Sequence, residues 1–309
     1  MRLSTRLILA LAAAAGQPIR VSGTAAPDPD PDSILLEPET SPQIRAGRPD
    51  QIHSGIRYDG KLRMDVLVPA GPGPHPLVLY LPGGGFVTAR RQLARKQRRY
   101  VAAAGYVVAS INYRTTSTGA TYRDGLTDVA TALAFLRQRA ATYRLDPDHV
   151  AVWGESAGGY LAAMAATEPG NRLNAAVVLF GASDLADLGT GFDPAIRDFY
   201  TTAGTPIPSY VLGPDRAPAD HPDEMRAADP ANRVTPQTPP FLILHGDDDR
   251  IIQPAQTAHL HQALRSAGAD STRYVLRGAG HGDISDNPEV WTSVPLMNRI
   301  TEFLHTNLR

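Results

Sequence analysis

The stretch "VAVWGESAGGYLAAMAA", Val150 to Ala166, decides the fold. An apolar run leads into the turn GESAG (residues 154–158), and an alanine-rich run of strong helix formers follows it. This is a G-x-S-x-G pattern between an expected strand and an expected helix, the context in which such a serine acts as a nucleophile. The glycines remove side chains that would collide, and the helix N-terminus favours developing negative charge. Ser156 is thus a candidate nucleophile, although a glycine-rich turn without chemistry remains an alternative at this point.

The rest of the chain alternates short apolar runs with helical ones. Several apolar runs are continuous, which is typical of strands buried on both faces of a parallel sheet. The alternation predicts an α/β fold with a mostly parallel central sheet and helices on both faces. Ligands of such sheets bind beyond the carboxyl ends of the strands, so chemistry is expected in the loops that follow them. The expected strands are residues 62–68, 77–81, 106–111, 149–153, 175–180, 241–245 and 273–276, and the expected helices are about 89–103, 123–141, 157–167, 254–267 and 294–306.

The composition limits the partners and the chemistry. The chain has 309 residues, of which 42% are hydrophobic and 20% charged, and a formal net charge of -1. This balance predicts no attraction to nucleic acid or to anionic membranes. Because there is no cysteine, disulfides, thiol catalysis and Cys-ligated zinc are excluded. No cofactor is expected, and a metal site at His245 with the three aspartates of residues 247–249 is disfavoured, because neighbouring positions in one turn rarely converge on one ion.

The first 26 residues resemble a secretory signal peptide. A basic start, MRLSTR, precedes the apolar residues 7–15, a run too short to span a bilayer. Small residues follow, with possible cleavage after Ala15 or Ala26. We therefore expect a secreted or exported protein without a membrane span; the alternative is a cytoplasmic protein with a frayed, alanine-rich start.

The chain is expected to form one folded domain that follows an N-terminal linker. Residues 27–49 begin with PDPDPD and are expected to be disordered, because such a segment cannot bury apolar surface. The folded domain is expected over residues 50–309. Within it, the proline-rich residues 185–225 look irregular and are a possible lid or pocket wall. The aromatic residues of this segment could line a substrate pocket or anchor the segment to the domain; they are Phe192, Phe199, Tyr200 and Tyr210.

A second chemical signal is LPGGGFVTA, residues 81–89, which follows an expected strand. Three successive glycines allow backbone N–H groups to face a bound oxygen. A flexible loop without function is one alternative. A phosphate-binding loop is another, but no Lys-Ser/Thr pair follows the glycines as that motif requires.

A third signal lies in two loops near the C-terminus. FLILHGDDDRIIQP, residues 241–254, places three aspartates after a buried strand. LRGAGHGDI, residues 276–284, places His281 in a glycine-rich loop after the next strand. The other histidines lie in no comparable glycine-rich loop, so His281 is the candidate general base.

Together these loops resemble those of the α/β-hydrolase superfamily, specifically the hormone-sensitive-lipase-like and ferulic/acetyl-esterase-like carboxylesterases. The resemblance covers residues 50–309 and is carried by PGGGF, VVASINYR, LDPDHVAVWGESAGG, PPFLILHGDDDRII and GAGHG. The order serine, aspartate, histidine along the chain is the one expected for this superfamily. It implies that Ser156 attacks an ester carbonyl and that His281 accepts and returns the proton. The family pattern H-G-x-x-D-x-x-V selects Asp249 as the carboxylate that holds the imidazole, and leaves the two preceding aspartates as turn residues.

The resemblance also implies an oxyanion hole formed by the amides of Gly84, Gly85 and Ala157. The sequence departs from the family here, because Pro82 stands where a histidine usually precedes the glycines. Since the hole uses backbone donors, activity is expected to survive this change. Phe86, beside the loop, is a candidate for the substrate pocket.

The expected activity is that of a serine carboxylesterase that hydrolyses short-chain or acetyl esters of small molecules through an acyl-enzyme. A small, open site is expected because no large helical cap precedes the core. One alternative is a peptidase or amidase similar to prolyl-oligopeptidase-like enzymes, which usually carry a propeller domain that about 50 preceding residues cannot supply. The other is a non-catalytic binding protein with a hydrolase fold, against which the complete set of serine, aspartate and histidine argues.

Overall fold

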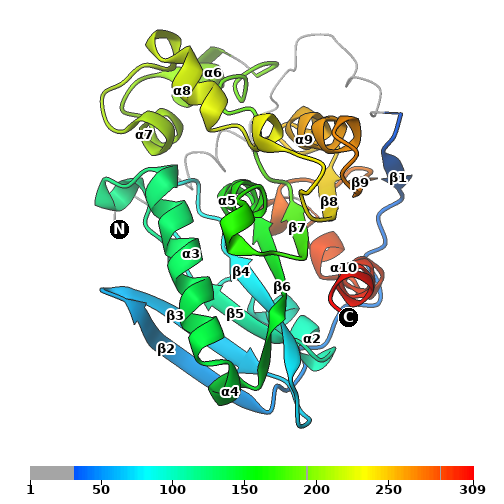
Figure 1. Cartoon of the computed structure of the whole chain (residues 1–309). Helices are drawn as coiled ribbons and strands as arrows, with labels where there is room; N and C mark the ends of the chain where they lie inside the picture. Colours follow the sequence, from blue (N-terminus) through cyan, green and yellow to red (C-terminus); the bar gives the residue numbers. More distant parts are fainter. Residues whose placement is uncertain (1–30, 193, 286) are drawn as a thin grey trace.

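A nine-stranded sheet runs through the described part of the chain, residues 31–192, 194–285 and 287–309 of a computed structural model (Figure 1). The strands are β1 (Ile34–Leu36), β2 (Gln51–Asp59), β3 (Leu62–Val68), β4 (His75–Leu81), β5 (Val107–Ile111), β6 (Leu145–Glu155), β7 (Ala175–Leu179), β8 (Phe241–Gly246) and β9 (Ser271–Leu276). Their order across the sheet is β1-β9-β8-β7-β6-β4-β5-β3-β2. β3 pairs antiparallel with β2 and β5, and the other neighbours are parallel. The mostly parallel sheet predicted from the sequence is confirmed.

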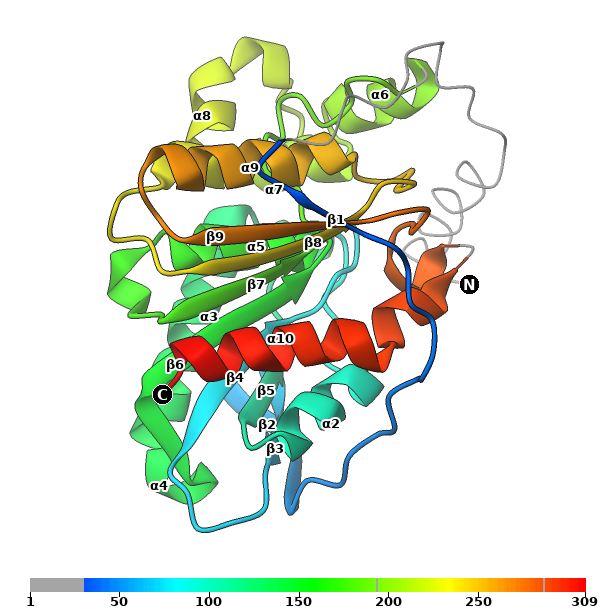
Figure 2. The same cartoon turned by 90° about the vertical axis from the view of Figure 1, so that its right-hand side faces the viewer.

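Helices cover both faces of this sheet (Figure 2). They are α2 (Arg95–Ala103), α3 (Tyr122–Gln138), α4 (Ala140–Tyr143), α5 (Ala157–Ala166), α6 (Pro194–Thr201), α7 (Pro206–Leu212), α8 (Pro222–Ala227), α9 (Pro254–Ser266) and α10 (Val294–Asn307). Successive side chains of β4 alternate between two cores: Leu77 and Leu79 pack with α3, α5 and α9, whereas Val78 and Tyr80 pack with α2 and α10. Burial on both faces explains why the central strands are continuously apolar. None of the described helices combines the length and apolarity needed to cross a bilayer.

Residues 31–49, ahead of the expected domain, include positions that pack against it. The expected signal peptide, residues 1–26, lies outside the described residues. β1 pairs in parallel with β9, and Ile44, only 1% exposed, belongs to the same core as α10. The N–H of Ile44 also donates to Thr292 O at 2.9 Å. The prediction of a disordered linker over residues 27–49 is therefore wrong for β1 and Ile44, because apolar residues after PDPDPD cover a sheet edge and fill the core.

Residues 185–225 are more regular than the sequence predicts. They contain α6, α7 and α8, which gather at the top of Figure 1. Each of these helices begins with a proline, namely Pro194, Pro206 and Pro222. Proline is favoured in the first turn of a helix, where its missing N–H has no intrahelical partner to lose. The prolines that suggest an irregular segment are therefore helix starts.

Two aromatic residues attach this segment to the domain. Tyr200 is buried, and its hydroxyl donates to Ile251 O at 2.6 Å. Tyr210 is fully buried, with its ring centroid 5.1 Å from that of Phe86. For these two residues the structure supports anchoring, the second of the alternatives left open by the sequence.

Candidate active site

Ser156 lies in the sharp turn between the end of β6 and the start of α5. Its φ of 54° and ψ of -125° lie outside the regions that non-glycine residues usually adopt, so the backbone is strained here. The N–H of Ser156 donates to Leu179 O on β7 at 3.0 Å, which holds the turn at the sheet edge. A Cβ on Gly158 would lie 2.1 Å from Leu81 O, so only glycine lets α5 approach the neighbouring strand this closely.

Three loops bring a serine, a histidine and an aspartate into contact. His281 follows β9, and its Nε2 lies 2.8 Å from Ser156 Oγ. Its Nδ1 lies 2.7 Å from Oδ2 of Asp249, in the loop after β8. The imidazole is 6% exposed, and its centroid is 4.7 Å from that of the Phe180 ring. In this arrangement the imidazole can accept the serine proton while its other nitrogen is held by a carboxylate.

Asp249 is the member of the three-aspartate cluster that meets His281. Asp247 instead accepts a hydrogen bond from the backbone of the loop after β9. Asp248 forms an exposed ion pair with Arg250 at 3.1 Å. The two preceding aspartates thus hold the turn, as the sequence pattern implies.

The surroundings of Asp249 stabilise its charged form. Oδ1 accepts the N–H groups of Ile251 and Ile252, both at 2.9 Å. Oδ2 faces His281 and also His245, whose Nε2 is 3.1 Å away. Burial alone would raise the pKa of Asp249, but the charge of His281 and the hydrogen bonds from both histidines outweigh it and hold the pKa well below its usual range.

The glycine loop after β4 lies beside the nucleophile. A Cβ built on Gly83 would be 3.1 Å from Ser156 Cβ. Gly84 O accepts the N–H groups of Val87 and Thr88, both at 3.1 Å. A Cβ on Gly84, which has a φ of 153°, would lie 2.0 Å from Thr88 O. Glycine is therefore required where the loop turns back on itself next to the serine.

The amides assigned to the oxyanion hole have no backbone acceptor in the described part of the chain. This holds for the N–H groups of Gly84 and Gly85. Ala157 is the first residue of α5, so its N–H precedes the intrahelical hydrogen bonds. All three amides are thus available to a ligand oxygen.

A tyrosine that we did not assign to the site from sequence supports this loop. Tyr113 is buried, and its hydroxyl donates to Pro82 O at 2.7 Å. Thr116 N–H donates to Phe86 O at 3.0 Å, so the segment after β5 holds both ends of the glycine loop. The sequence signal for Tyr113 is the NYR of VVASINYR, which follows a strand at the same sheet edge.

Phe86 lies in the core. Its ring is 3% exposed and packs against Tyr160 and Tyr210, at centroid distances of 5.6 and 5.1 Å. Little of the side chain is left to contact a substrate, so the predicted pocket role is not what its packing indicates.

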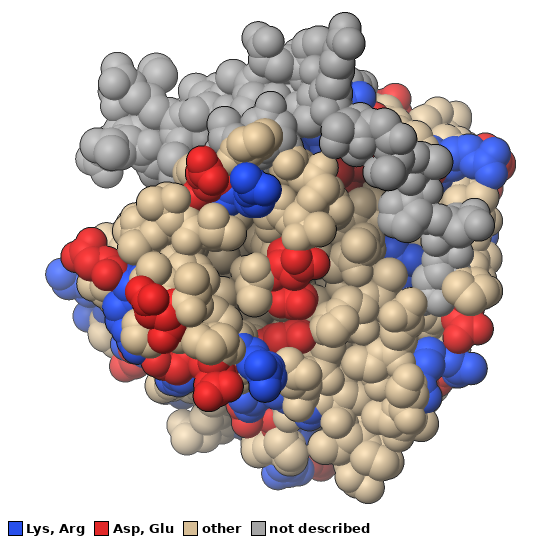
Figure 3. Space-filling model, turned by 90° about the horizontal axis from the view of Figure 1, so that it is seen from above, with Lys and Arg blue, Asp and Glu red and all other residues tan. Residues whose placement is uncertain are grey.

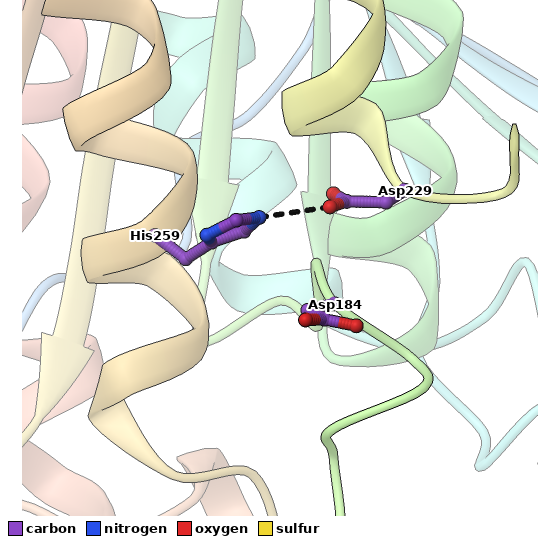
Figure 4. A group of neighbouring side chains, drawn as sticks. All are labelled: Asp184, Asp229 and His259. Carbon is purple, nitrogen blue, oxygen red and sulfur yellow. Dashed lines mark hydrogen bonds and ion pairs between the residues drawn. The ribbon is translucent and has the colours of Figure 1, made fainter. Parts of the chain in front are cut away.

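The described residues bring together one possible metal-binding group outside this site, shown in Figure 4. Asp184, Asp229 and His259 each place a ligand atom within 4.8 Å of the others. His259 Nε2 is 2.8 Å from Asp229 Oδ2, and this hydrogen bond raises the pKa of His259. Asp229 also accepts from Ser183 Oγ at 3.0 Å and from Ala231 N–H at 2.8 Å. The buried carboxylate of Asp229 already accepts hydrogen bonds from protein donors. We therefore interpret the group as a structural contact between α9 and the loops packed on it.

This group lines a cavity of about 650 Å³. Figure 3 shows acidic side chains in a hollow on the face that carries it. Its other walls include Thr201, Met225 and Asn232, and neither Ser156 nor His281 is among the described residues that line it. The cavity is therefore not built around Ser156 and His281.

Comparison with known proteins gives a consistent result. Residues 64–264 match the model of the BD-FAE family. Esterase LipQ of Mycobacterium tuberculosis is 30% identical over 223 residues, which are 67% of this chain and 50% of that protein. Esterase LipC of the same organism is 32% identical over 224 residues, 68% of this chain and 53% of that protein. The chain thus spans about half the length of these curated relatives.

The fold is shared with solved esterase structures. A truncated carbohydrate esterase from gut microbiota superposes with a TM-score of 0.73 at 21% identity, covering 86% of this chain and 99% of that one. The α/β-hydrolase fold expected from the sequence is therefore confirmed. Because the family match extends over most of the sequence and includes both Ser156 and Asp249, the chain belongs to the BD-FAE family of α/β-hydrolases.

Proposed function

We propose that this protein is a serine carboxylic ester hydrolase that acts through an acyl-enzyme on short-chain or acetyl esters. The observation that carries the proposal is the position of His281, whose two ring nitrogens lie 2.8 Å from Ser156 Oγ and 2.7 Å from Asp249 Oδ2. The names of LipQ and LipC as esterases support the same reaction.

The proposed reaction follows from this geometry. The Ser156 hydroxyl transfers its proton to His281 Nε2 as Oγ attacks the ester carbonyl, and the carbonyl oxygen becomes negatively charged. The amides of the glycine loop and of Ala157 stabilise that oxygen. His281 then protonates the leaving alcohol, and the acyl group remains on the serine. A water molecule repeats the sequence, with His281 as base, and releases the acid.

The preference for short acyl groups rests on the packing around the serine. Phe86, directly after the three glycines, packs with Tyr160 and Tyr210 in a buried aromatic cluster. That space is therefore filled by the protein itself. A series of p-nitrophenyl esters from acetate to octanoate tests the preference; highest kcat/KM on the long chains would contradict it.

The variant Ser156→Ala tests the reaction itself. Hydrolysis of p-nitrophenyl acetate is expected to fall by at least about 10³-fold, because the nucleophile is lost. The matched control is Ser266→Ala, which alters an exposed serine at the end of α9 and is expected to keep wild-type turnover. Both variants should unfold near the wild-type temperature.

The outcomes separate the alternatives. Full turnover by Ser156→Ala would refute the proposed nucleophile. Faster cleavage of p-nitroanilides than of matched esters by the wild-type protein would favour the peptidase or amidase. A wild-type protein that hydrolyses neither class would favour a binding protein.

A further inference from the structure

A second histidine contacts the carboxylate of Asp249. His245 is the penultimate residue of β8 and its side chain is fully buried; its Nε2 lies 3.1 Å from Asp249 Oδ2 and 2.8 Å from Ile252 O. On the other side of the ring, Nδ1 lies 2.8 Å from Thr257 Oγ1 on α9. The imidazole therefore joins the catalytic loop to a helix.

The positions of the protons on this ring follow from its neighbours. Burial lowers the pKa of His245, so the ring is neutral near pH 7 and carries one proton. Two oxygens, from Asp249 and Ile252, face Nε2, so the proton must be on Nε2 to avoid repulsion. Nδ1 is then an acceptor, and the Thr257 hydroxyl is the donor that faces it.

A buried arginine also donates a hydrogen bond to the hydroxyl of Thr257. Arg273 on β9 is 2% exposed, and its Nε donates to Thr257 Oγ1 at 3.1 Å. Its Nη2 donates to Pro254 O at 2.8 Å, a carbonyl that also lies 3.1 Å from Thr257 Oγ1 and is the other acceptor within reach of that hydroxyl. Its Nη1 donates to Ser33 Oγ at 2.7 Å, just before β1. One directed chain of hydrogen bonds thus runs from Arg273 through Thr257 and His245 to Asp249.

We propose that Thr257 and His245 are positioning residues that fix the orientation of the Asp249 carboxylate toward His281. This inference rests on the proposed hydrolase function. With the N–H groups of Ile251 and Ile252 on Oδ1, the carboxylate has four donors and cannot rotate without losing several of them. Removing the hydroxyl of Thr257 leaves Nδ1 of His245 without its donor, so the ring, and with it the Nε2–H that faces Asp249, is no longer held from the side of α9.

The test compares Thr257→Val, which removes the hydroxyl at nearly constant volume, with Thr257→Ser, which keeps it. Active serine is first titrated with diethyl p-nitrophenyl phosphate, so that kcat for p-nitrophenyl acetate refers to folded, reactive enzyme. His281 acts in both acylation and deacylation, so kcat of the valine variant should fall about tenfold, with KM changed less than about twofold. The serine variant should retain most of the wild-type kcat. Thr167→Val is the matched control, because that buried hydroxyl bonds only to Met164 O on the far end of α5 and its kcat should not change.

The inference can be tested even if the Thr257→Val variant does not fold. A wild-type kcat for Thr257→Val, or equal losses for the valine and serine variants, would overturn it. If Thr257→Val does not fold, His245→Gln and His245→Leu replace it: the amide of glutamine can supply an N–H near the position of Nε2, so it should retain a higher kcat than leucine. Equal kcat values for these two would also overturn the inference. Failure of the hydrolase proposal is seen separately, as undiminished turnover by Ser156→Ala.

Discussion

The difference in stability between Glu155→Gln and the wild type should depend on pH in a direction that the structure sets. Glu155 ends β6, directly before the nucleophile, and burial of its carboxyl group raises its pKa to about 7. Tyr80 favours the ionised form, as do His281 and Arg98, while Asp283 opposes it, and these effects do not cancel the burial. The folded protein therefore binds a proton that the unfolded chain releases near pH 4.5, the ordinary pKa of a glutamate.

The sign and size of the change in stability with pH follow from this difference between the two pKa values of Glu155. Between about pH 4.5 and about pH 7 the folded state holds more protons than the unfolded state, so wild-type stability falls as the pH rises. Because the unfolded chain ionises more readily, Glu155 lowers wild-type stability by about 1 kcal/mol at about pH 5, and by about 3 kcal/mol at about pH 8.5, where the full cost applies. Glutamine has no proton to lose. Any constant effect of the substitution cancels when the two pH values are compared, so the gain of Glu155→Gln over wild type should grow by about 2 kcal/mol.

The assay is urea unfolding followed by circular dichroism at these two pH values, with wild type and variant measured side by side. Glu302→Gln is the control, since this glutamate is exposed on α10 and its substitution should show no such growth. A difference between Glu155→Gln and wild type that is the same at both pH values would refute the reasoning, because it would mean that the carboxyl group ionises alike in both states.

Two further predictions concern the catalytic loops. Asp249→Asn should lower kcat for p-nitrophenyl acetate by about 10³–10⁴-fold, because an amide cannot hold the imidazole in the required tautomer or stabilise its cation. A loss below about tenfold in steady-state kinetics would contradict the role of Asp249. Tyr113→Phe removes the donor to Pro82 O and should lower kcat about three- to tenfold with little change in KM, because the oxyanion amides lose their support. Equal kcat for Tyr113→Phe and wild type would show that the proline holds the loop unaided.

The sequence predicts the parts of the site that follow directly from strand order. Ser156, Asp249 and His281 each lie in the turn or loop that follows an apolar run, and parallel strands bring such loops to one edge. The intervening strand β7 does not prevent this, because the loops after β8 and β9 extend over it to reach the serine. The sequence does not give the distances between the three side chains, but it does predict that they lie close together.

Other features depend on contacts that no local pattern encodes. β2 lies at an edge and is largely exposed, so its residues lack the apolar run that marks the central strands. β1 is recognised only through its pairing with β9. Tyr113 and Thr257 look like ordinary residues of a loop and a helix, and their roles depend on which carbonyl or imidazole the fold places beside them.

Asp249 and Glu155, two buried carboxyl groups that both interact electrostatically with His281, have opposite pKa shifts, and the number of donors explains the difference. Asp249 is buried but receives two backbone N–H groups and two imidazoles, which favour its charged form. Glu155 is subject to the same kind of burial with far fewer compensating donors, and its pKa rises. His281 needs one anion to stabilise its cation while it carries the serine proton. A second permanent anion beside it would stabilise that cation further and slow the return of the proton to the leaving alcohol. Near its pKa of about 7 the carboxyl group of Glu155 is only half ionised, whereas Asp249 stays charged across that range, so the anion that holds His281 is Asp249.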